Sequence, residues 1–111
     1  ILDGFADADL GGCVDSGKST TGYVFTIGGT SISWMSRLQK CVALSTIEAE
    51  YMAIVEAAKE LIWLKNFLSE LRMHQEDCVL HCDNQSAVYL AKNPVFHSRT
   101  KHIQMRYHFI R

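Results

Sequence analysis

The stretch STIEAEYMAIVEAAKELIWLKNFLSEL, residues 45–71, decides the fold because it carries a long and regular helical pattern. Its apolar residues recur at alternating spacings of three and four, which places them on one side of a helix that turns by about 100° per residue. Ser45 and Thr46 are candidate caps, and Glu48 is close enough for a capping-box contact. The pattern predicts a helix that ends near Leu71, with this apolar stripe: Ile54, Ala57, Leu61, Leu64, Leu68 and Leu71.

Two glutamates near the start of this helix point in different directions. Extending the apolar stripe by one turn reaches Glu50, whereas Glu48 falls roughly 160° away. Glu50 is therefore expected to face inward. The alternative is that Glu50 lies at the rim of the core with its carboxylate turned to water, because unpaired acids are rarely buried. Met52, Val55 and Trp63 add apolar bulk to the other side, so the helix is either central or packs against a further partner.

The segments before this helix have strand patterns. Residues 23–27 and 31–34 are β-rich runs separated by Gly28-Gly29, a pair that suits a tight hairpin turn. Residues 1–9 are a plausible third strand, although their three aspartates make them poor strand formers.

The segments after the helix predict a strand-to-helix unit. Residues 78–82 have the pattern of a short buried strand that ends at Asp83, and residues 84–92 that of a helix stopped by Asn93-Pro94. Residues 101–111 resemble the start of another helix. The whole pattern predicts an α/β fold, in which ligands bind just outside the carboxyl ends of strands. Asp83 is at such an end.

Length, charge and cysteine usage indicate one intracellular domain. The 111 residues fit a single domain, and the net charge of −1 excludes a uniformly basic surface, although residues 96–111 contain no acid. The four cysteines form no CxxC pair and follow no secretory leader, so we expect reduced thiols and no secretion. No apolar run approaches the ~20 residues of a membrane span. The chain lacks an initiator methionine and ends in mid-pattern, which suggests an excised piece of a longer chain.

Residues 12–19, GCVDSGKS, match the phosphate-binding pattern GxxxxGK[ST] letter for letter. A P-loop needs an apolar strand before it and a helix after it, so that backbone amides face the phosphates. Here acids precede the match, and Thr21-Gly22 and a β-rich run follow it. A polar hairpin loop is the better interpretation.

A zinc site could be sought in His74, Cys78, His81 and Cys82. Their spacings match no standard ligand pattern, and three of the four lie on one predicted strand. We interpret Cys78 and Cys82 as buried thiols that act as small hydrophobes.

Three separated acids are the remaining candidate site. Asp7 or Asp9 lies on a predicted strand, Glu50 on the inward side of the helix and Asp83 at the end of another strand. Acids that pack together are tolerated when a cation neutralises them, and Mg²⁺ prefers oxygen ligands. Two such ions can activate water and stabilise the leaving oxygen of a phosphodiester. The residues alone leave open that these are scattered, solvated charges.

Five sequence blocks run in order along nearly the whole chain: ADAD at 6–9, KSTTGY at 18–23, STIEAEY at 45–51, CDNQSA at 82–87 and HSRTKHI at 97–103. Together they resemble the ribonuclease H region of copia-type (Ty1-like) retrotransposon Pol polyproteins. The resemblance implies an α/β, ribonuclease H-like mixed sheet, with antiparallel strands 1–3 plus a parallel strand, and helices. It also implies that the chain is truncated before the family's fifth strand and last helix. Residues 1–111 would form a single ribonuclease H-like domain that is incomplete at its C-terminus.

The resemblance assigns the site residue by residue. Asp7 matches the family's first carboxylate, Glu50 its helix glutamate and Asp83 its third carboxylate, and the fourth would lie beyond Arg111. Three positions depart from the usual family residues: Leu10, Cys13 and Gln104.

The implied activity is hydrolysis of the RNA strand of RNA–DNA hybrids during reverse transcription. It would depend on two Mg²⁺ ions, with Mn²⁺ as a possible substitute, held by the three matched carboxylates. Expected partners are the hybrid and the reverse transcriptase part of the same polyprotein, without a membrane or a small-molecule cofactor. An inactive remnant, or a module that binds nucleic acid or its polyprotein neighbour without cutting, is the alternative. The residues expected to contact nucleic acid are Asn84, Gln85, His97, Arg99, Lys101, His102 and Arg106.

Overall fold

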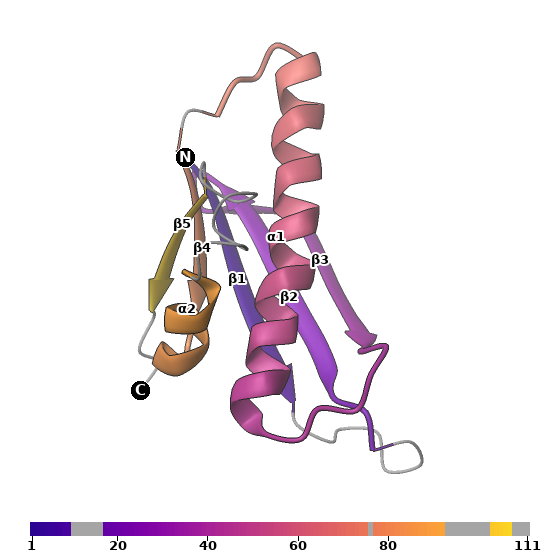
Figure 1. Ribbon diagram of the computed structural model, residues 1–111. Helices are drawn as coiled ribbons and strands as arrows, with labels where there is room; N and C mark the ends of the chain where they lie inside the picture. Colours follow the sequence, from indigo (N-terminus) through magenta and orange to yellow (C-terminus); the bar gives the residue numbers. More distant parts are fainter. Residues whose placement is uncertain (10–16, 76, 93–102, 108–111) are drawn as a thin grey trace.

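Five strands and two helices make up the part of the chain that the structure describes, residues 1–9, 17–75, 77–92 and 103–107 of a computed structural model (Figure 1). Three strands precede the long helix, and two strands and a short helix follow it. The elements in chain order are β1 (Leu2–Asp9), β2 (Thr20–Ile27), β3 (Thr30–Leu38), α1 (Thr46–Glu70), β4 (Cys78–Cys82), α2 (Gln85–Ala91) and β5 (Ile103–Tyr107).

The strands form one mixed sheet in the order β3-β2-β1-β4-β5. The first three are antiparallel to one another, whereas β4 pairs parallel to β1 and β5 parallel to β4. The first strand of the chain therefore lies at the centre of the sheet. This arrangement confirms the predicted combination of antiparallel strands 1–3 with a parallel strand.

The β2–β3 hairpin turns at Gly28 and Gly29, as predicted. Both residues have positive φ angles, 58° and 83°, which glycine adopts without steric cost. The two strands extend beyond the predicted runs, because main-chain pairing continues to Thr20 opposite Leu38. A strand, not a helix, thus follows the P-loop-like residues, which agrees with their interpretation as a loop. Residues 12–16 of that match lie outside the described part of the chain.

The fifth strand corrects two predictions from the sequence. The segment from residue 101 was predicted to begin a helix, and the chain was expected to end before its fifth strand. Instead, β5 pairs with β4 along its whole length, from Ile103 opposite Cys78 to Tyr107 opposite Cys82. Ile103 and Met105 are buried while the residue after each is exposed, an alternation with the period of a strand. The helical interpretation was wrong. Ile103 and Tyr107 are four residues apart, and this spacing puts two residues on one face in a helix and in a strand alike, so it does not distinguish the two structures.

Helix α1 begins and packs as its sequence predicts. The Ser45 hydroxyl caps it by accepting a hydrogen bond from the Glu48 amide at 3.1 Å, and the Glu48 carboxylate accepts one from the Leu44 amide at 3.2 Å. The predicted stripe is buried from Ile54 to Leu68. Leu71 is 55% exposed because the helix ends at Glu70, one residue before it. Neither helix in the described part of the chain is long and apolar enough to cross a membrane.

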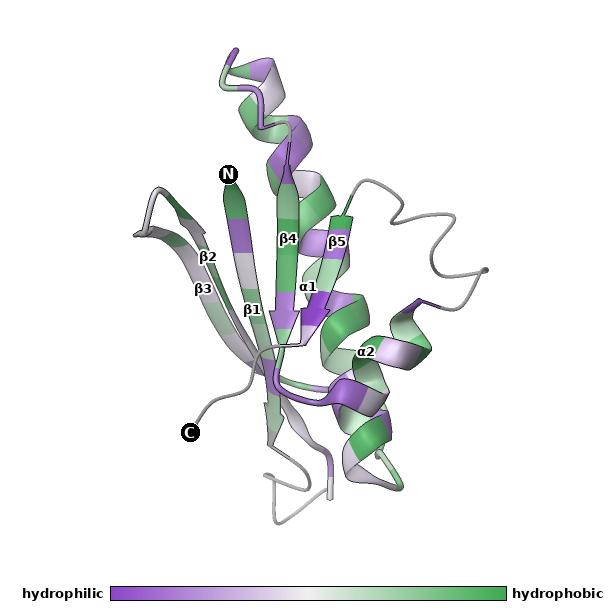
Figure 2. Ribbon diagram, turned by 90° about the vertical axis from the view of Figure 1, so that its left-hand side faces the viewer, coloured by the Kyte–Doolittle hydropathy of each residue, from purple (hydrophilic) through white to green (hydrophobic). Residues whose placement is uncertain are grey.

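Both helices cover the same face of the sheet, as Figure 2 shows from the side. α1 packs on β1, β2 and β4, and α2 packs on β4 and β5. The core between these layers includes Leu2, Phe25, Ile54, Leu61 and Leu80, each at most 1% exposed. No helix of the described residues lies on the opposite face, where alternate β1 residues such as Phe5 and Asp7 are exposed.

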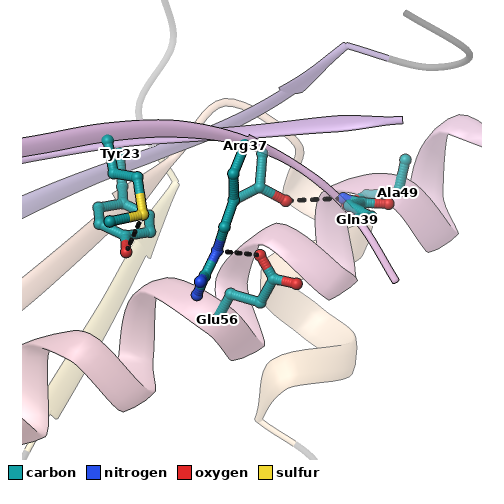
Figure 3. Close-up of polar contacts among 7 residues, drawn as sticks. Tyr23, Arg37, Gln39, Ala49 and Glu56 are labelled. Carbon is teal, nitrogen blue, oxygen red and sulfur yellow. Dashed lines mark hydrogen bonds and ion pairs between the residues drawn. The ribbon is translucent and has the colours of Figure 1, made fainter. Parts of the chain in front are cut away.

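A buried glutamine ties the start of α1 to the sheet (Figure 3). Gln39 is 1% exposed, and its Nε2 donates hydrogen bonds to the Thr21 hydroxyl and the Ala49 carbonyl oxygen, both at 2.9 Å. A second link joins Arg37 of β3 to Glu56 of α1, with Nε and Oε2 3.9 Å apart. Because Ala49 immediately precedes Glu50, the first link fixes the helix turn that carries this glutamate.

Candidate metal centre

Asp7 and Asp83 lie where the pairing between the two central parallel strands stops. β1 pairs with β4 only as far as Ala6 opposite Cys82, but it continues along β2, so that Asp7 is opposite Gly22. Asp7 is thus the first β1 residue past the end of β4, and Asp83 is the first residue after β4. Open α/β sheets bind ligands at such strand ends. The side chain of Asp9, the alternative to Asp7, lies outside the described residues.

Glu50 joins this strand end from the helical layer. It belongs to the second turn of α1 and is 4% exposed, whereas Glu48 is partly exposed and serves the helix cap. The structure therefore confirms that Glu50 faces inward, and the alternative in which it lies at the rim is wrong.

Burial and two neighbouring acids raise the pKa of Glu50 to about 8. Desolvation is the largest cause, followed by the negative charges of Asp83 and then Asp7. A hydrogen bond with the Asp7 side chain favours the protonated form, and one from the Ala8 amide opposes it. A divalent cation among the three carboxyl groups would reverse this balance, because it favours their charged forms. The donor set therefore fits a hard cation.

Cys82 is a member of the site that the sequence interpretation missed. Its thiol is 2% exposed, and Sγ donates a weak hydrogen bond to Glu50 Oε2 at 3.9 Å. The ligand atoms of Glu50, Cys82 and Asp83 all lie within 4.8 Å of one another. Burial, and to a lesser degree the nearby carboxylates, raise the pKa of the thiol to about 12. Its position immediately before Asp83 was the available signal.

The four residues of the rejected zinc site are not assembled into one cluster, in agreement with that rejection. Cys78 and Cys82 point toward the helical layer, whereas His81 lies between them on the other face of β4. There its Nε2 is 3.1 Å from Asp3 Oδ1, and its ring stacks on Phe5 at a centroid distance of 4.6 Å. His74 is exposed, and its Nδ1 is 2.8 Å from the Ser69 hydroxyl oxygen.

An apolar cleft of about 360 Å³ adjoins the carboxylates. Phe5, Val24 and Trp34 line it on the helix-free face of the sheet, and both Asp7 and Asp83 reach it. The acids are thus open to solvent on one side although Glu50 is buried behind them. Among the described residues, this open side gives a large ligand access to Asp7 and Asp83.

The predicted nucleic-acid contacts divide into described and undescribed residues. Asn84 caps α2, because its side-chain oxygen accepts a hydrogen bond from the Ala87 amide at 2.9 Å. Gln85 is exposed at the first position of α2, and Arg106 is exposed on β5 opposite His81 of β4. The other four lie outside the described residues: His97, Arg99, Lys101 and His102.

Known proteins resemble this chain both in sequence and in fold. The chain is 60% identical over 111 residues to the Retrovirus-related Pol polyprotein from transposon TNT 1-94 of Nicotiana tabacum, and 46% identical to that from transposon RE2 of Arabidopsis thaliana. The alignments cover 100% and 99% of this chain but 8% of either polyprotein. No protein-family model matches the chain.

Among solved structures, LC11-RNase H1 in complex with an RNA/DNA hybrid aligns with a TM-score of 0.70 at 13% identity, covering 98% of this chain and 86% of that one. Sheet order and this similarity together define a domain with the ribonuclease H fold. In sequence, the chain is similar along its whole length to a short part of these retrotransposon Pol polyproteins. Both findings confirm the resemblance seen in the sequence.

Proposed function

We propose that this chain hydrolyses the RNA strand of RNA–DNA hybrids with Mg²⁺, as part of reverse transcription by a copia-type retrotransposon. The observation that carries the proposal is the position of Glu50, which is buried beside Asp7 and Asp83 in a ribonuclease H fold. Three acids at one strand end are costly for a fold and useful for binding cations.

Each carboxylate has a part in this proposal. Asp7 and Asp83 would bind the ions from the open side of the sheet, and Glu50 would bind them from the helical layer after losing its proton to solvent. Bound Mg²⁺, or Mn²⁺ in its place, would activate water and stabilise the leaving oxygen. Gln39 would hold the turn of α1 that positions Glu50, through its hydrogen bond to the Ala49 carbonyl.

The substrate would lie across the open side of the carboxylates. Gln85 and Arg106 are exposed polar side chains at or near the ends of β4 and β5, where they could contact the sugar–phosphate backbone. The whole polyprotein is far longer than this chain, so we also propose that the domain acts beside the reverse transcriptase part of the same polyprotein, inside the cell.

Cleavage of a labelled RNA–DNA hybrid tests the proposal. The chain should cut the RNA strand with Mg²⁺ and not with EDTA. Asp83→Asn should lower the rate by roughly a hundredfold or more, because a metal ligand matters at least as much as the groups around it. Glu50→Gln should do the same, whereas its matched control Glu48→Gln, on the outer side of the same helix, should retain the wild-type rate.

Two results would count against the site. Unchanged cleavage by Asp83→Asn would remove the assignment of the carboxylates. Absence of Mg²⁺-dependent cleavage, both here and in a longer piece of the polyprotein that continues past residue 111, would favour the alternative, a domain that binds without cutting.

A further inference from the structure

The strand end that carries the carboxylates also presents a sulfur ligand. Glu50, Cys82 and Asp83 place one carboxylate oxygen, one thiol sulfur and a second carboxylate oxygen within 4.8 Å of one another. Carboxylates suit hard cations such as Mg²⁺, whereas thiolates select thiophilic ions such as Zn²⁺. This set contains both kinds.

The two buried thiols of β4 show why Cys82, in particular, could take part. Cys78 and Cys82 are each 2% exposed and point to the same face of the sheet. The Cys78 thiol lies near one positive and one negative group, the Lys65 ammonium and the Asp77 carboxylate. The groups around Cys82 are Glu50, Asp83 and Asp7, all carboxyl groups. The surroundings of Cys82 are therefore the more negative of the two.

The buried position of Glu50 points to a cation independently of the sulfur. The residue is 4% exposed, and its oxygen Oε2 faces the Cys82 sulfur at 3.9 Å. The charged groups that act on it in the described part of the chain are two further carboxylates. A cation between Oε2 and Sγ would neutralise this concentration of acid at the point where its charge is most costly.

We propose that Glu50, Cys82 and Asp83 form a mixed oxygen–sulfur site for a thiophilic divalent cation, Zn²⁺ or Cd²⁺. Binding forms a metal–sulfur bond, and the thiol proton, with the proton of Glu50 where present, leaves to solvent. The site shares Glu50 and Asp83 with the proposed Mg²⁺ centre. That overlap rests on the proposed function, but the sulfur site itself rests on the three ligand atoms.

Titration of the chain with Cd²⁺ tests the proposal without any substrate. Cadmium bound to a thiolate has an ultraviolet charge-transfer absorption, so the wild-type chain should show this band at saturation. Cys82→Ala should lose the part of the absorption that appears first in the titration, which reports the Cd²⁺ site of highest affinity. The matched variant Cys78→Ala, which removes an equally buried thiol from the same strand and face, should keep it, as should Cys41→Ala, which removes an exposed thiol. Circular dichroism establishes that each variant is folded.

A second variant covers the case in which Cys82→Ala does not fold. Glu50→Gln keeps every thiol but should weaken the binding of Cd²⁺ by at least roughly tenfold, and excess Mg²⁺ should weaken it in the wild type. A high-affinity band that survives Cys82→Ala, or that is unaffected by Glu50→Gln, would overturn the proposal.

The outcomes of the two experiments are separable. If the hybrid is cut with Mg²⁺ but the cadmium band does not depend on Cys82, the proposed function stands and the sulfur site fails. If the band depends on Cys82 and Glu50 but no hybrid is cut, the sulfur site stands and the proposed function fails.

Discussion

Glu50 couples the stability of this fold to pH. Its pKa is about 8 in the folded chain against an ordinary value of 4.5, so between these values the unfolded chain has released a proton that the folded chain retains. The free energy of unfolding should therefore fall as pH rises through this window, by about 1.4 kcal/mol per unit of pKa difference at most. Urea unfolding at pH 5 and pH 9, without divalent cations, measures the effect.

The variant Glu50→Gln isolates this contribution. It cannot ionise, so its stability should depend less on pH than that of the wild type, and it should be the more stable of the two at pH 9. Adding Mg²⁺ at pH 9 should stabilise the wild type and not the variant. Equal pH dependence of the two proteins would show that Glu50 ionises normally in the folded state.

Sequence reasoning placed the carboxylates of the candidate site but did not place Cys82 beside them. Glu50 could be separated from Glu48 because a helix fixes the angle between successive side chains, and Asp83 could be placed because it ends an apolar strand. Cys82 was correctly predicted to be buried. Its proximity to Glu50 depends on how α1 crosses the sheet. The residue pattern of α1 or of β4 alone does not show how these two distant segments pack against each other.

A buried residue of the preceding loop, Gln39, links the start of α1 to the sheet. Replacing Gln39 with leucine would preserve its bulk but leave the Thr21 hydroxyl and the Ala49 carbonyl oxygen without their buried donor. We expect the free energy of unfolding to fall by about 1–3 kcal/mol. Urea unfolding measures it, with the exposed neighbour Lys40→Leu as the control.

A leucine variant as stable as the wild type would show that these hydrogen bonds make no net contribution to the free energy of unfolding. Loss of stability together with weaker metal binding would show that the same bonds position Glu50.

The elements with a long or strongly marked pattern could be predicted, and the last strand could not. α1 repeats its apolar pattern over 25 residues. The hairpin turn contains two consecutive glycines, a pair that is typical of a tight turn between strands. β5 has five residues, too few for a helical and an alternating pattern to be told apart. What makes it a strand is the main chain of β4 beside it, a partner supplied by the fold.

The edge strand β3 should allow copies of the whole molecule to associate. Eight of its nine residues are exposed, among them Trp34 at 73%, and Arg37 is its one charged residue. Exposed edge strands that carry few charges can pair with other strands, and a net charge of −1 gives little repulsion. Sedimentation over a range of concentrations should therefore show reversible self-association.

Two tryptophans provide the test of this edge. Trp34→Lys places a charge on β3 and should raise the concentration needed for association by roughly tenfold or more, which corresponds to about 1.4 kcal/mol. Trp63→Lys changes a tryptophan that is 57% exposed on the helix α1 and does not belong to strand β3, and it should have no such effect. Equal behaviour of the two variants would place the contact elsewhere.

The central position of β1 determines when the site can form during translation. β1, β2, β3 and α1 emerge from the ribosome first, and they already contain Asp7 and Glu50. β4, which pairs with the other side of β1 and delivers Cys82 and Asp83, is synthesised only after the whole of α1. The β4 side of β1 therefore has no native partner strand until residues 78–82 have been made. Until then the growing chain has two of the three carboxylates of the candidate site.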